Sequence, residues 1–422
     1  MSVLEATRLI RFSEPRRCTF VGFVAFVVDR SAMSLRNSRA IAVAVVTAAT
    51  FTDIVALGLA VPVLPDLGRR LGASPLVIGL LFGSFGATML VISLPMGAIS
   101  DRVGRRAPML AGLAALAGAT LLFAYSRDLR TLFAARLVQG AADATTWVVG
   151  FALIADLYPP EARGRVTGII LGGTSVAYMV GPSIGGWLYE IGGVRLPFLF
   201  VTGMAGLTAA AFAALRLPDH RASREAVPIA WLLRDRQVRA CGVIVLLMAA
   251  TMTMFEPLFV LFLQDSLHIG PAQVGSVFAA AALGNTFFHP IVGRMTDAWG
   301  ARRLAGIGLL VSAAVLPFIA HVWNFPSAVM LCLAQAAAFA LVGAPSLTFM
   351  ADATSEAGLG SFGAAYGFYN AIWAVGLLCG PALGGYLFER MRFSTLTLGW
   401  AAAVAAITLA LPVFRSASTA RP

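Results

Sequence analysis

Twelve long apolar segments, separated by short polar intervals, constrain this chain more than any other feature of its sequence. A helix of roughly 20 apolar residues crosses the core of a bilayer, which is about 30 Å thick. Backbone groups find no water in that core, so a single segment that spans it must be helical. The segments are 40–64, 75–99, 107–126, 131–155, 166–189, 196–215, 240–264, 271–295, 304–322, 326–350, 361–388 and 394–414. We therefore predict an all-α integral membrane protein of about twelve transmembrane helices.

The composition is typical of a chain that is surrounded mainly by lipid. Hydrophobic residues make up 59% of it and charged residues only 12%, with a mean hydropathy of +0.84, whereas soluble domains carry about 25% charged residues. The net charge of +11 comes from arginines in short groups between the apolar segments, which favours membrane-flanking charge over a nucleic-acid surface. The chain has no lysine, so it has no complete Walker A loop and no Schiff-base lysine.

The sequence indicates neither a metal site nor an enzyme. The four cysteines (Cys18, Cys241, Cys332 and Cys379) are scattered and form no CxxC pair, which argues against a disulfide framework or a metal centre. No HExxH motif is present, and no His or Asp cluster has catalytic spacing. We therefore expect no metal, no cofactor and no catalytic activity.

The longest polar interval, Arg216 to Arg239, lies between the sixth and seventh apolar segments. We interpret it as a linker between two bundles of six helices. The predicted divisions are an N-terminal extension (1–38), a first bundle (39–216), a cytoplasmic linker (217–238), a second bundle (239–415) and a tail (416–422). The extension is expected either to be disordered or to precede the true start, because Met33 opens a shorter reading of the chain.

The arginines also predict the orientation of the chain. From Met33 onward, 18 arginines lie on the side of the N-terminus and 7 on the opposite side. Basic residues concentrate on the cytoplasmic side of membrane proteins. We therefore expect a multi-pass protein of the inner (plasma) membrane with both termini in the cytoplasm.

An internal repeat predicts the architecture. The segment 181–190 (GPSIGGWLYE) recurs as 380–389 (GPALGGYLFE), with six of ten positions identical. A second pair of segments begins at Gly97 and Gly293, 196 residues apart, and Gln139 is matched by Gln335 at the same offset. Self-similarity of this kind indicates two related halves. Halves in parallel orientation pack around a central cavity and rock against each other.

The repeated residues are candidates for conformational change. Charges in the loop repeats could form a charge–dipole latch that breaks when the transporter changes face, and the glycines and prolines permit close helix approach and bending. The alternative for the loop charges is a purely topological role. The gating candidates are Gly97, Asp101, Gly104, Arg105, Arg106, Gly181, Pro182, Gly185, Gly186, Gly293, Asp297, Arg302, Gly380 and Pro381.

Four ionisable residues within the apolar segments are candidates for proton coupling: Asp53, Arg136, Asp143 and Glu256. A charge at bilayer depth costs several kcal/mol unless it is paired or faces water, so such residues are functional candidates. Arg136 and Asp143 are seven residues apart and share one helix face, either as a proton relay or as a polar stripe satisfied by a neighbour. Asp53 is either a proton and cation site or a carboxyl group capped by the neighbouring Thr50 or Thr52. Glu256 precedes a proline that opens the helix, or else lies near the membrane surface.

Candidates for substrate contact lie in the same segments. Asp53 and Glu256 could act as counter-ions, and aromatic faces suit lipophilic cations. The further candidates are Gln139, Trp147, Tyr366, Tyr369 and Asn370. For each aromatic side chain the alternative is an ordinary place in the core or against lipid.

These motifs resemble the major facilitator superfamily over nearly all of residues 40–414. Segment 97–106 (GAISDRVGRR) is similar to the family's loop motif between helices 2 and 3, and segment 136–140 (RLVQG) to the helix-4 motif of proton-coupled members. Segment 173–186 is similar to the helix-5 motif of antiporters. Asp53 followed by PVLP resembles helix 1 of drug:proton antiporters, and Phe255-Glu256-Pro257 resembles the vesicular monoamine group. The resemblance implies two six-helix bundles around a central cavity.

The chain also departs from its nearest patterns. Ala340 and Asn370 stand where the vesicular amine pattern has acidic residues, Phe85 where it has a lysine, and Ala119 where tetracycline exporters have an aspartate. Asp143 is an acid that the amine pattern lacks. Neither substrate is therefore carried over from these groups.

The sequence as a whole predicts a proton-coupled antiporter that exports a small amphipathic organic compound, cationic and of the multidrug type, by alternating access. The expected partners are the substrate, protons and the lipid bilayer, with no nucleic acid, and one protomer is expected to function alone. One alternative is a facilitator of the same fold for a sugar or neutral metabolite. Another, from a different class, is a transport-inactive membrane sensor.

Overall fold

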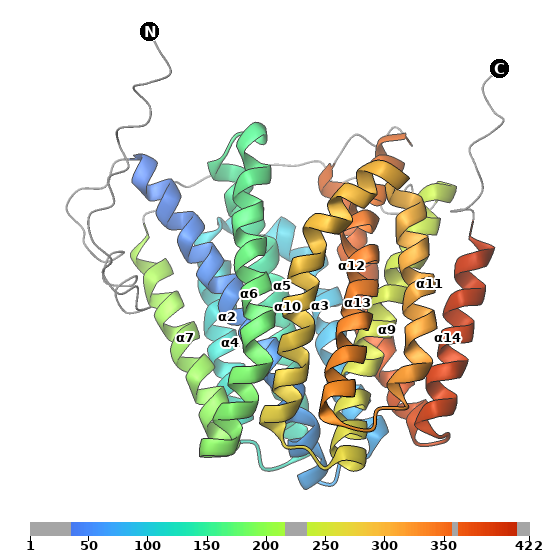
Figure 1. Ribbon diagram of the computed structural model, residues 1–422. Coiled ribbons are helices and arrows are strands. Elements are labelled where there is room, and N and C mark those ends of the chain that lie inside the picture. Colours follow the sequence, from blue (N-terminus) through green and yellow to red (C-terminus); the bar gives the residue numbers. More distant parts are fainter. Residues whose placement is uncertain (1–34, 216–233, 357–361, 412–422) are drawn as a thin grey trace, which may run out of the picture.

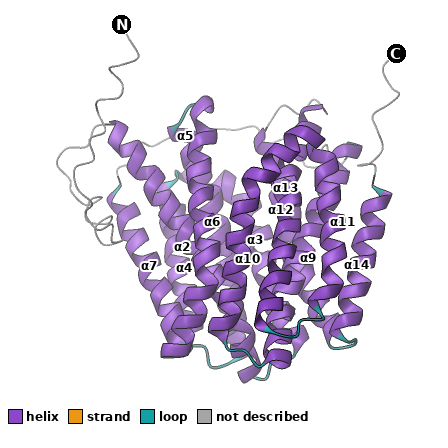
Figure 2. Ribbon diagram, in the orientation of Figure 1, coloured by secondary structure: helices purple, strands orange, loops and turns teal. Residues whose placement is uncertain are grey.

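The computed structural model describes residues 35–215, 234–356 and 362–411. These residues form helices joined by short turns, and Figure 2 shows no strand among them. The helices are α2 (Leu35–Arg70), α3 (Pro75–Val103), α4 (Arg106–Ala124), α5 (Leu129–Leu157), α6 (Pro160–Gly192), α7 (Arg195–Ala214), α9 (Arg236–Leu267), α10 (Pro271–Trp299), α11 (Ala301–Ile319), α12 (Phe325–Glu356), α13 (Phe362–Phe388) and α14 (Phe393–Ala410). All twelve are long and apolar enough to cross a membrane, which confirms the predicted fold class.

The predicted N-terminal extension, linker and tail lie outside the described residues, apart from 35–38 and 234–238. Each predicted span overlaps one helix, but the bounds differ. Spans 107–126, 196–215, 304–322 and 394–414 extend beyond the ends of α4, α7, α11 and α14, whereas several other helices are longer than their apolar segments. α2, for example, ends at Arg70, because the polar residues that follow the apolar segment form its last turns.

The helices form two groups of six, α2–α7 and α9–α14 (Figure 1). In the first group α2 packs against α6, and in the second α9 packs against α13. The two groups meet where α3 packs against α13 and α6 against α10. α2 begins and α14 ends on the same side of the molecule, at the top of Figure 1. We call this side the near end, and the opposite side, where α2 ends, the far end.

Side chains on the outside of the molecule fit a lipid environment. Trp187, Phe287 and Leu409 are 59%, 72% and 65% exposed. Such exposure is unfavourable in water but not among lipid tails, which are themselves apolar. With its twelve apolar spans, the chain is a multi-pass membrane protein.

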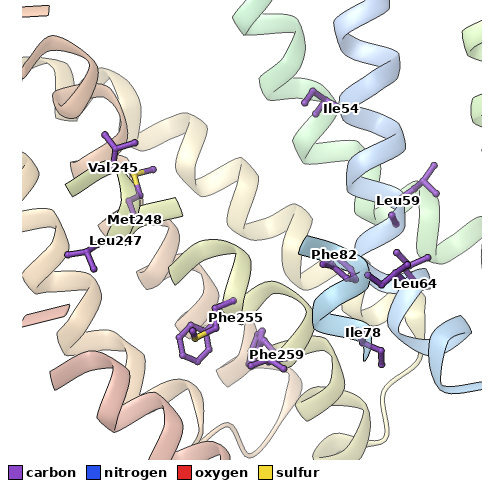
Figure 3. Packing of buried hydrophobic residues seen from close by; sticks show 14 of the residues in the cluster. Ile54, Leu59, Leu64, Ile78, Phe82, Val245, Leu247, Met248, Phe255 and Phe259 are labelled. Atoms are coloured by element: carbon purple, nitrogen blue, oxygen red, sulfur yellow. The ribbon is translucent and has the colours of Figure 1, made fainter. Parts of the chain in front are cut away.

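The interior is apolar and continuous across the two groups. Figure 3 shows Ile54 and Leu59 of α2, Phe82 of α3, and Phe255 and Phe259 of α9 in one cluster of buried side chains. Because residues of both groups share this core, the two bundles hold the central cavity between them.

Local sequence explains where the helices begin and end. Ser74 caps α3 and is followed by Pro75, which suits a first helical position because it has no N–H to leave unpaired. Asp128 caps α5 by accepting from the Thr131 N–H at 2.8 Å. Gly104 ends α3 at φ 84°, a conformation that residues with a side chain rarely adopt.

Candidate functional site

A small cavity lies between the two halves and holds charged and aromatic side chains. Its volume is about 50 Å³. A cavity of this size holds a few waters, whereas sites for drug-sized ligands are about 300–1,000 Å³. The first half contributes Leu57, Phe82, Phe85, Arg136 and Tyr178, and the second half Met252, Thr253, Glu256, Trp373, Leu377 and Pro381. A ligand of that size would fit only in a wider form of this cavity.

Arg136 on α5 is the positive charge of the cavity and is 1% exposed. Its Nη1 donates to Gln139 Oε1 at 2.9 Å, one turn further along the same helix. Its guanidinium carbon lies 4.6 Å from the ring centre of Phe82 and 5.5 Å from that of Phe85. Such cation–π contacts stabilise a desolvated guanidinium. No acceptor among the described residues takes the buried Nε–H, which leaves a donor for a ligand.

Glu256 on α9 is the negative charge of the cavity. It lines the wall contributed by the second half and attracts Arg136 electrostatically across the cavity. Pro257 follows it and has no N–H, so the helix lacks one hydrogen bond at this point and the Thr253 carbonyl loses its usual donor. Glu256 therefore lies in the cavity between the two halves, next to a break in the hydrogen bonding of its helix.

Asp53 on α2 and Asp143 on α5 form a carboxyl pair beside the cavity. They are 1% and 4% exposed, and their carboxyl groups lie within hydrogen-bonding reach of each other. A carboxylate has no proton to donate, so two carboxyl groups bond directly only when one of them is protonated. The Trp147 Nε1–H donates to Asp53 Oδ2 at 3.1 Å. A buried pair of this kind is suited to holding one proton between its two carboxyl groups.

The pair is connected to the cavity through Tyr178 of α6. Tyr178 lines the cavity and lies within electrostatic range of Asp53, Asp143 and Glu256. Thr50 and Thr52, the capping partners considered for Asp53, donate instead to carbonyls of their own helix.

The candidates on α13 occupy other places. The Tyr369 hydroxyl is buried and lies 3.1 Å from Ser346 Oγ of α12. Asn370 is half-buried and does not line the cavity, and the Tyr366 side chain lies outside the described residues. α13 lines the cavity with Trp373, Leu377 and Pro381 instead. The substrate contacts assigned to Tyr366, Tyr369 and Asn370 stay predictions.

At the near end, the loop motif forms a network around Arg105. Its Nη2 pairs with Asp101 at 2.5 Å and its Nε with Asp156 at 2.8 Å, while its Nη1 donates to Ser100 Oγ at 2.6 Å. Burial lowers the pKa of Arg105, but the hydrogen bonds and charges of Asp156 and Asp101 outweigh it and raise the pKa above its ordinary value. Arg106 Nη2 donates to the Ala213 carbonyl of α7 at 2.6 Å. These contacts join α3, α5 and α7 within the first half.

The second half has the equivalent loop at the near end, with a more open surface and with Ala301 at the position that corresponds to Arg105. Gly300 has φ 83°, close to that of Gly104. Arg302 and Asp352 line a hollow of about 420 Å³ at the near end, whereas Asp297 is exposed. Asp352 follows Asp156 by 196 residues, the offset of the loop repeat. Sequence reasoning missed both aspartates, although this offset could have found them.

The glycines and prolines of the ten-residue repeat lie where backbones come close. A Cβ on Gly185 would lie 2.5 Å from the Leu59 Cα of α2, and one on Gly380 would lie 2.5 Å from the Ala250 carbonyl oxygen of α9. Gly181 and Pro182 face Gly58 in the same way. By contrast, a Cβ on Gly293 would meet nothing within 4 Å.

Sequence reasoning also missed several residues that line the cavity, because in the sequence they look like ordinary apolar helix positions. They include Phe82, Phe85, Tyr178 and Trp373.

No group of three or more His, Cys, Asp or Glu side chains in the described part of the chain could hold a metal. Cys241, Cys332 and Cys379 are free thiols, and the Cys241 thiol donates to the Ser346 carbonyl at 3.3 Å.

Two related bundles of membrane-spanning helices around a charged central cavity are the architecture typical of secondary transporters. A family model described as "Major Facilitator Superfamily" matches residues 46–233 and 241–422. The chain belongs to this superfamily, which confirms the resemblance found in the sequence.

The vesicular transporters are among its relatives. The vesicular acetylcholine transporter of Rattus norvegicus is 29% identical over 339 residues, which cover 76% of this chain and 62% of the relative. The synaptic vesicular amine transporter of Homo sapiens is 25% identical over 325 residues, which cover 76% and 63%. The chain thus spans less than two thirds of the length of these relatives.

Solved structures show the same fold. A mutant form of the nucleoside transporter NupG superposes with a TM-score of 0.71 at 13% identity, covering 89% of this chain and 100% of the other. An inward-facing, unoccupied bacterial homolog of the lysosomal transporter Spinster gives 0.68 at 15% identity, covering 91% and 95%. At these identities the likeness concerns the fold alone.

Proposed function

We propose that this protein is a proton-coupled antiporter that exports a small amphipathic organic cation, with multidrug compounds as the first class to test. The observation that carries the proposal is the buried pair of carboxyl groups, Asp53 and Asp143, beside a cavity that contains Glu256. A carrier that exchanges a proton for a cation needs a carboxyl group whose ionisation responds to the cation. Here the carboxyl pair lies close enough to the cavity to interact electrostatically with side chains that line it.

The chemistry of the cavity supports a cationic substrate. Glu256 supplies a counter-ion, and Tyr178 and Trp373 supply aromatic faces on which a lipophilic cation can rest. The related vesicular transporters are named for acetylcholine and amines, which are compounds of this charge class. In this proposal Glu256 binds the cation and the pair of Asp53 and Asp143 carries the proton.

We propose that the protein lies in a bacterial-type inner membrane with its near end on the cytoplasmic side. One protomer acts alone. The excess of arginine on the near side supports this orientation. The motifs 97–106 and 181–186 of the first bundle (39–216) would act in the change of face, together with their repeats, which begin at Gly293 and Gly380 in the second bundle (239–415).

A second candidate is a facilitator of zwitterionic or neutral solutes. The unpartnered Nε–H of Arg136 favours it, because a ligand with both a donor and an acceptor could bridge Arg136 and Glu256.

Proton release from everted membrane vesicles that hold an acid-inside gradient tests the proposal. We expect one or more lipophilic cations to collapse the gradient in the wild type and at least about tenfold more slowly in Asp53→Asn, because the remaining carboxylate has lost its proton-sharing partner. Asp128→Asn is the matched control, since Asp128 caps α5 outside the cavity.

If no cation from a broad panel releases protons, the proposal fails. Counterflow of neutral or zwitterionic solutes in the same vesicles would then support the second candidate. Release that persists unchanged in Asp53→Asn would remove Asp53 from the proton path.

A further inference from the structure

The repeated segments 181–190 and 380–389 both end in a glutamate, and neither glutamate belongs to the cavity or to the near-end network. We propose that Glu190 and Glu389 are two locks that hold the far end closed, each by capping the first turn of a helix in the opposite half. The inference rests on the alternating access of the proposed function, and assigns to these two residues the closure of one face.

The two contacts are equivalent. Glu190 Oε1 accepts from the Ala272 N–H of α10 at 3.0 Å, and Glu389 Oε1 accepts from the Leu76 N–H of α3 at 2.9 Å. Leu76 and Ala272 are 196 residues apart, and each directly follows the proline that begins its helix. Each half therefore contributes one glutamate that caps a helix of the other half.

Both helices need an acceptor at this point. The first N–H groups of a helix have no partner within it, and Pro75 and Pro271 make Leu76 and Ala272 the first residues with an N–H to satisfy. Gly270, at the cap position of α10, has no side chain that could accept. A carboxylate at a helix N-terminus is favourable both as an acceptor and as a charge.

Glycines allow the two halves to come within reach of these glutamates. A Cβ on Gly186 would lie 2.2 Å from the Pro271 carbonyl oxygen, and one on Gly385 would lie 2.4 Å from that of Pro75. Real Cβ atoms do not approach so closely. The repeat thus combines one glycine for backbone contact with one glutamate for the cap, in both halves.

Mild acid leaves the Glu389 lock in place. The Ser74 hydroxyl and the Leu76 N–H of α3 hold the pKa of the Glu389 carboxyl below its usual range, and Arg390 in the same turn acts in the same direction. The cap is present above the ordinary carboxyl pKa of about 4.3 and is lost as pH falls through the lowered value. The Glu389 carboxylate therefore stays charged, and its cap stays in place, at mildly acidic pH.

Opening the far end separates α3 from α13 and α6 from α10, which breaks both caps at once. Losing one cap should raise the ratio of open to closed molecules about fivefold. The two caps belong to different helix pairs, so losing both should raise it about 25-fold if their effects are independent.

Alkylation of a cysteine in the cavity measures this ratio. In a background without the native cysteines, Met252→Cys is placed in the cavity, and a membrane-impermeant thiol reagent is added on the far side of oriented proteoliposomes. We expect alkylation about fivefold faster in Glu190→Ala or Glu389→Ala and about 25-fold faster in the double variant. The corresponding Glu→Gln variants keep an acceptor but lose the charge. Their alkylation rates should lie between those of the alanine variants and that of the parent.

Asp128→Ala is the matched control, because it removes a far-end cap within one half and should leave the rate within about twofold. A double variant that reacts within about twofold of the parent overturns the proposal. If the double variant does not fold, amide exchange in the unsubstituted protein decides: the Leu76 and Ala272 amides must be protected, and unprotected amides overturn it.

The alkylation rate reports the opening of the far end and requires no transport. If the alkylation rates change as expected but no cation releases protons, this inference stands and the proposed function fails. If cations release protons but the alkylation rates do not change, the proposed function stands and this inference fails.

Discussion

The buried charges among the described residues have partners of different kinds, and the partner determines what the charge can do. Arg136 rests on two phenylalanine rings, Asp53 lies next to a second carboxyl group, Asp143, and Arg105 lies between two carboxylates. The first two arrangements leave a donor or a proton available for exchange. The third pairs its charges directly, so Arg105 is suited to holding helices together.

Arg105→Ala should lower the free energy of unfolding by about 3 kcal/mol, because it leaves the buried Asp156 carboxylate without its cation. Arg102→Ala, in the same motif but exposed, should change it by less than about 0.5 kcal/mol. Unfolding in detergent, followed by tryptophan fluorescence, measures both. Equal effects for the two variants would contradict a structural role specific to Arg105.

At the scale of helices, the contacts between the halves depend on backbone proximity at a few glycines. Gly79 of α3 meets the Pro381 carbonyl of α13, and Gly275 of α10 meets the Pro182 carbonyl of α6, with added Cβ atoms 2.1 Å and 2.2 Å away. Lipid offers no hydrophobic drive for helices to associate, so close van der Waals packing supplies much of the attraction. The far end is held by these approaches together with the pair of Arg69 and Asp265.

Gly186→Ala should destabilise the protein by about 1–3 kcal/mol, since its methyl group would overlap the Pro271 carbonyl oxygen. Gly206→Ala on α7 meets nothing within 4 Å and should be neutral or slightly stabilising, because alanine favours helix over glycine. Thermal melting of both variants tests the contrast. A neutral Gly186→Ala would mean that the halves separate freely at this point.

At the scale of the whole molecule, the small cavity shows that the described form is contracted around the site. A volume of about 50 Å³ leaves no room for an amphipathic organic cation. Binding must therefore move α2, α3 and α5 of one half relative to α9 and α13 of the other. Such a shift between discrete packings is what alternating access requires.

A transported cation should change the distance between spin labels at Val103→Cys and Trp299→Cys, exposed equivalent positions at the near end. It should also raise stability by about 2.7 kcal/mol at 100 times its Kd. Both effects should disappear in Glu256→Gln, which removes the counter-ion. Bound cation with an unchanged distance distribution would place the binding site elsewhere.

The number of spans, the two related halves and the intramembrane charges could all be predicted from the sequence. These features follow from local chemistry, because the bilayer excludes unpaired backbone and unpaired charge wherever they occur in the chain. The repeat offset located equivalent residues before any contact was known, including the glutamates at 190 and 389.

Which of these residues meet depends on the packing of the helices in three dimensions. That Asp53 bonds to Asp143, that Arg136 faces Phe82, and that Glu389 caps a helix in the other half depends on how each helix is rotated against its neighbours. Spacing along one helix determines which side chains share a face, but the partner of that face is chosen by packing between segments far apart in the chain. The sequence therefore identified the charged groups, and the packing of the two halves determined which of them lie together, which line the cavity and which cap a helix of the other half.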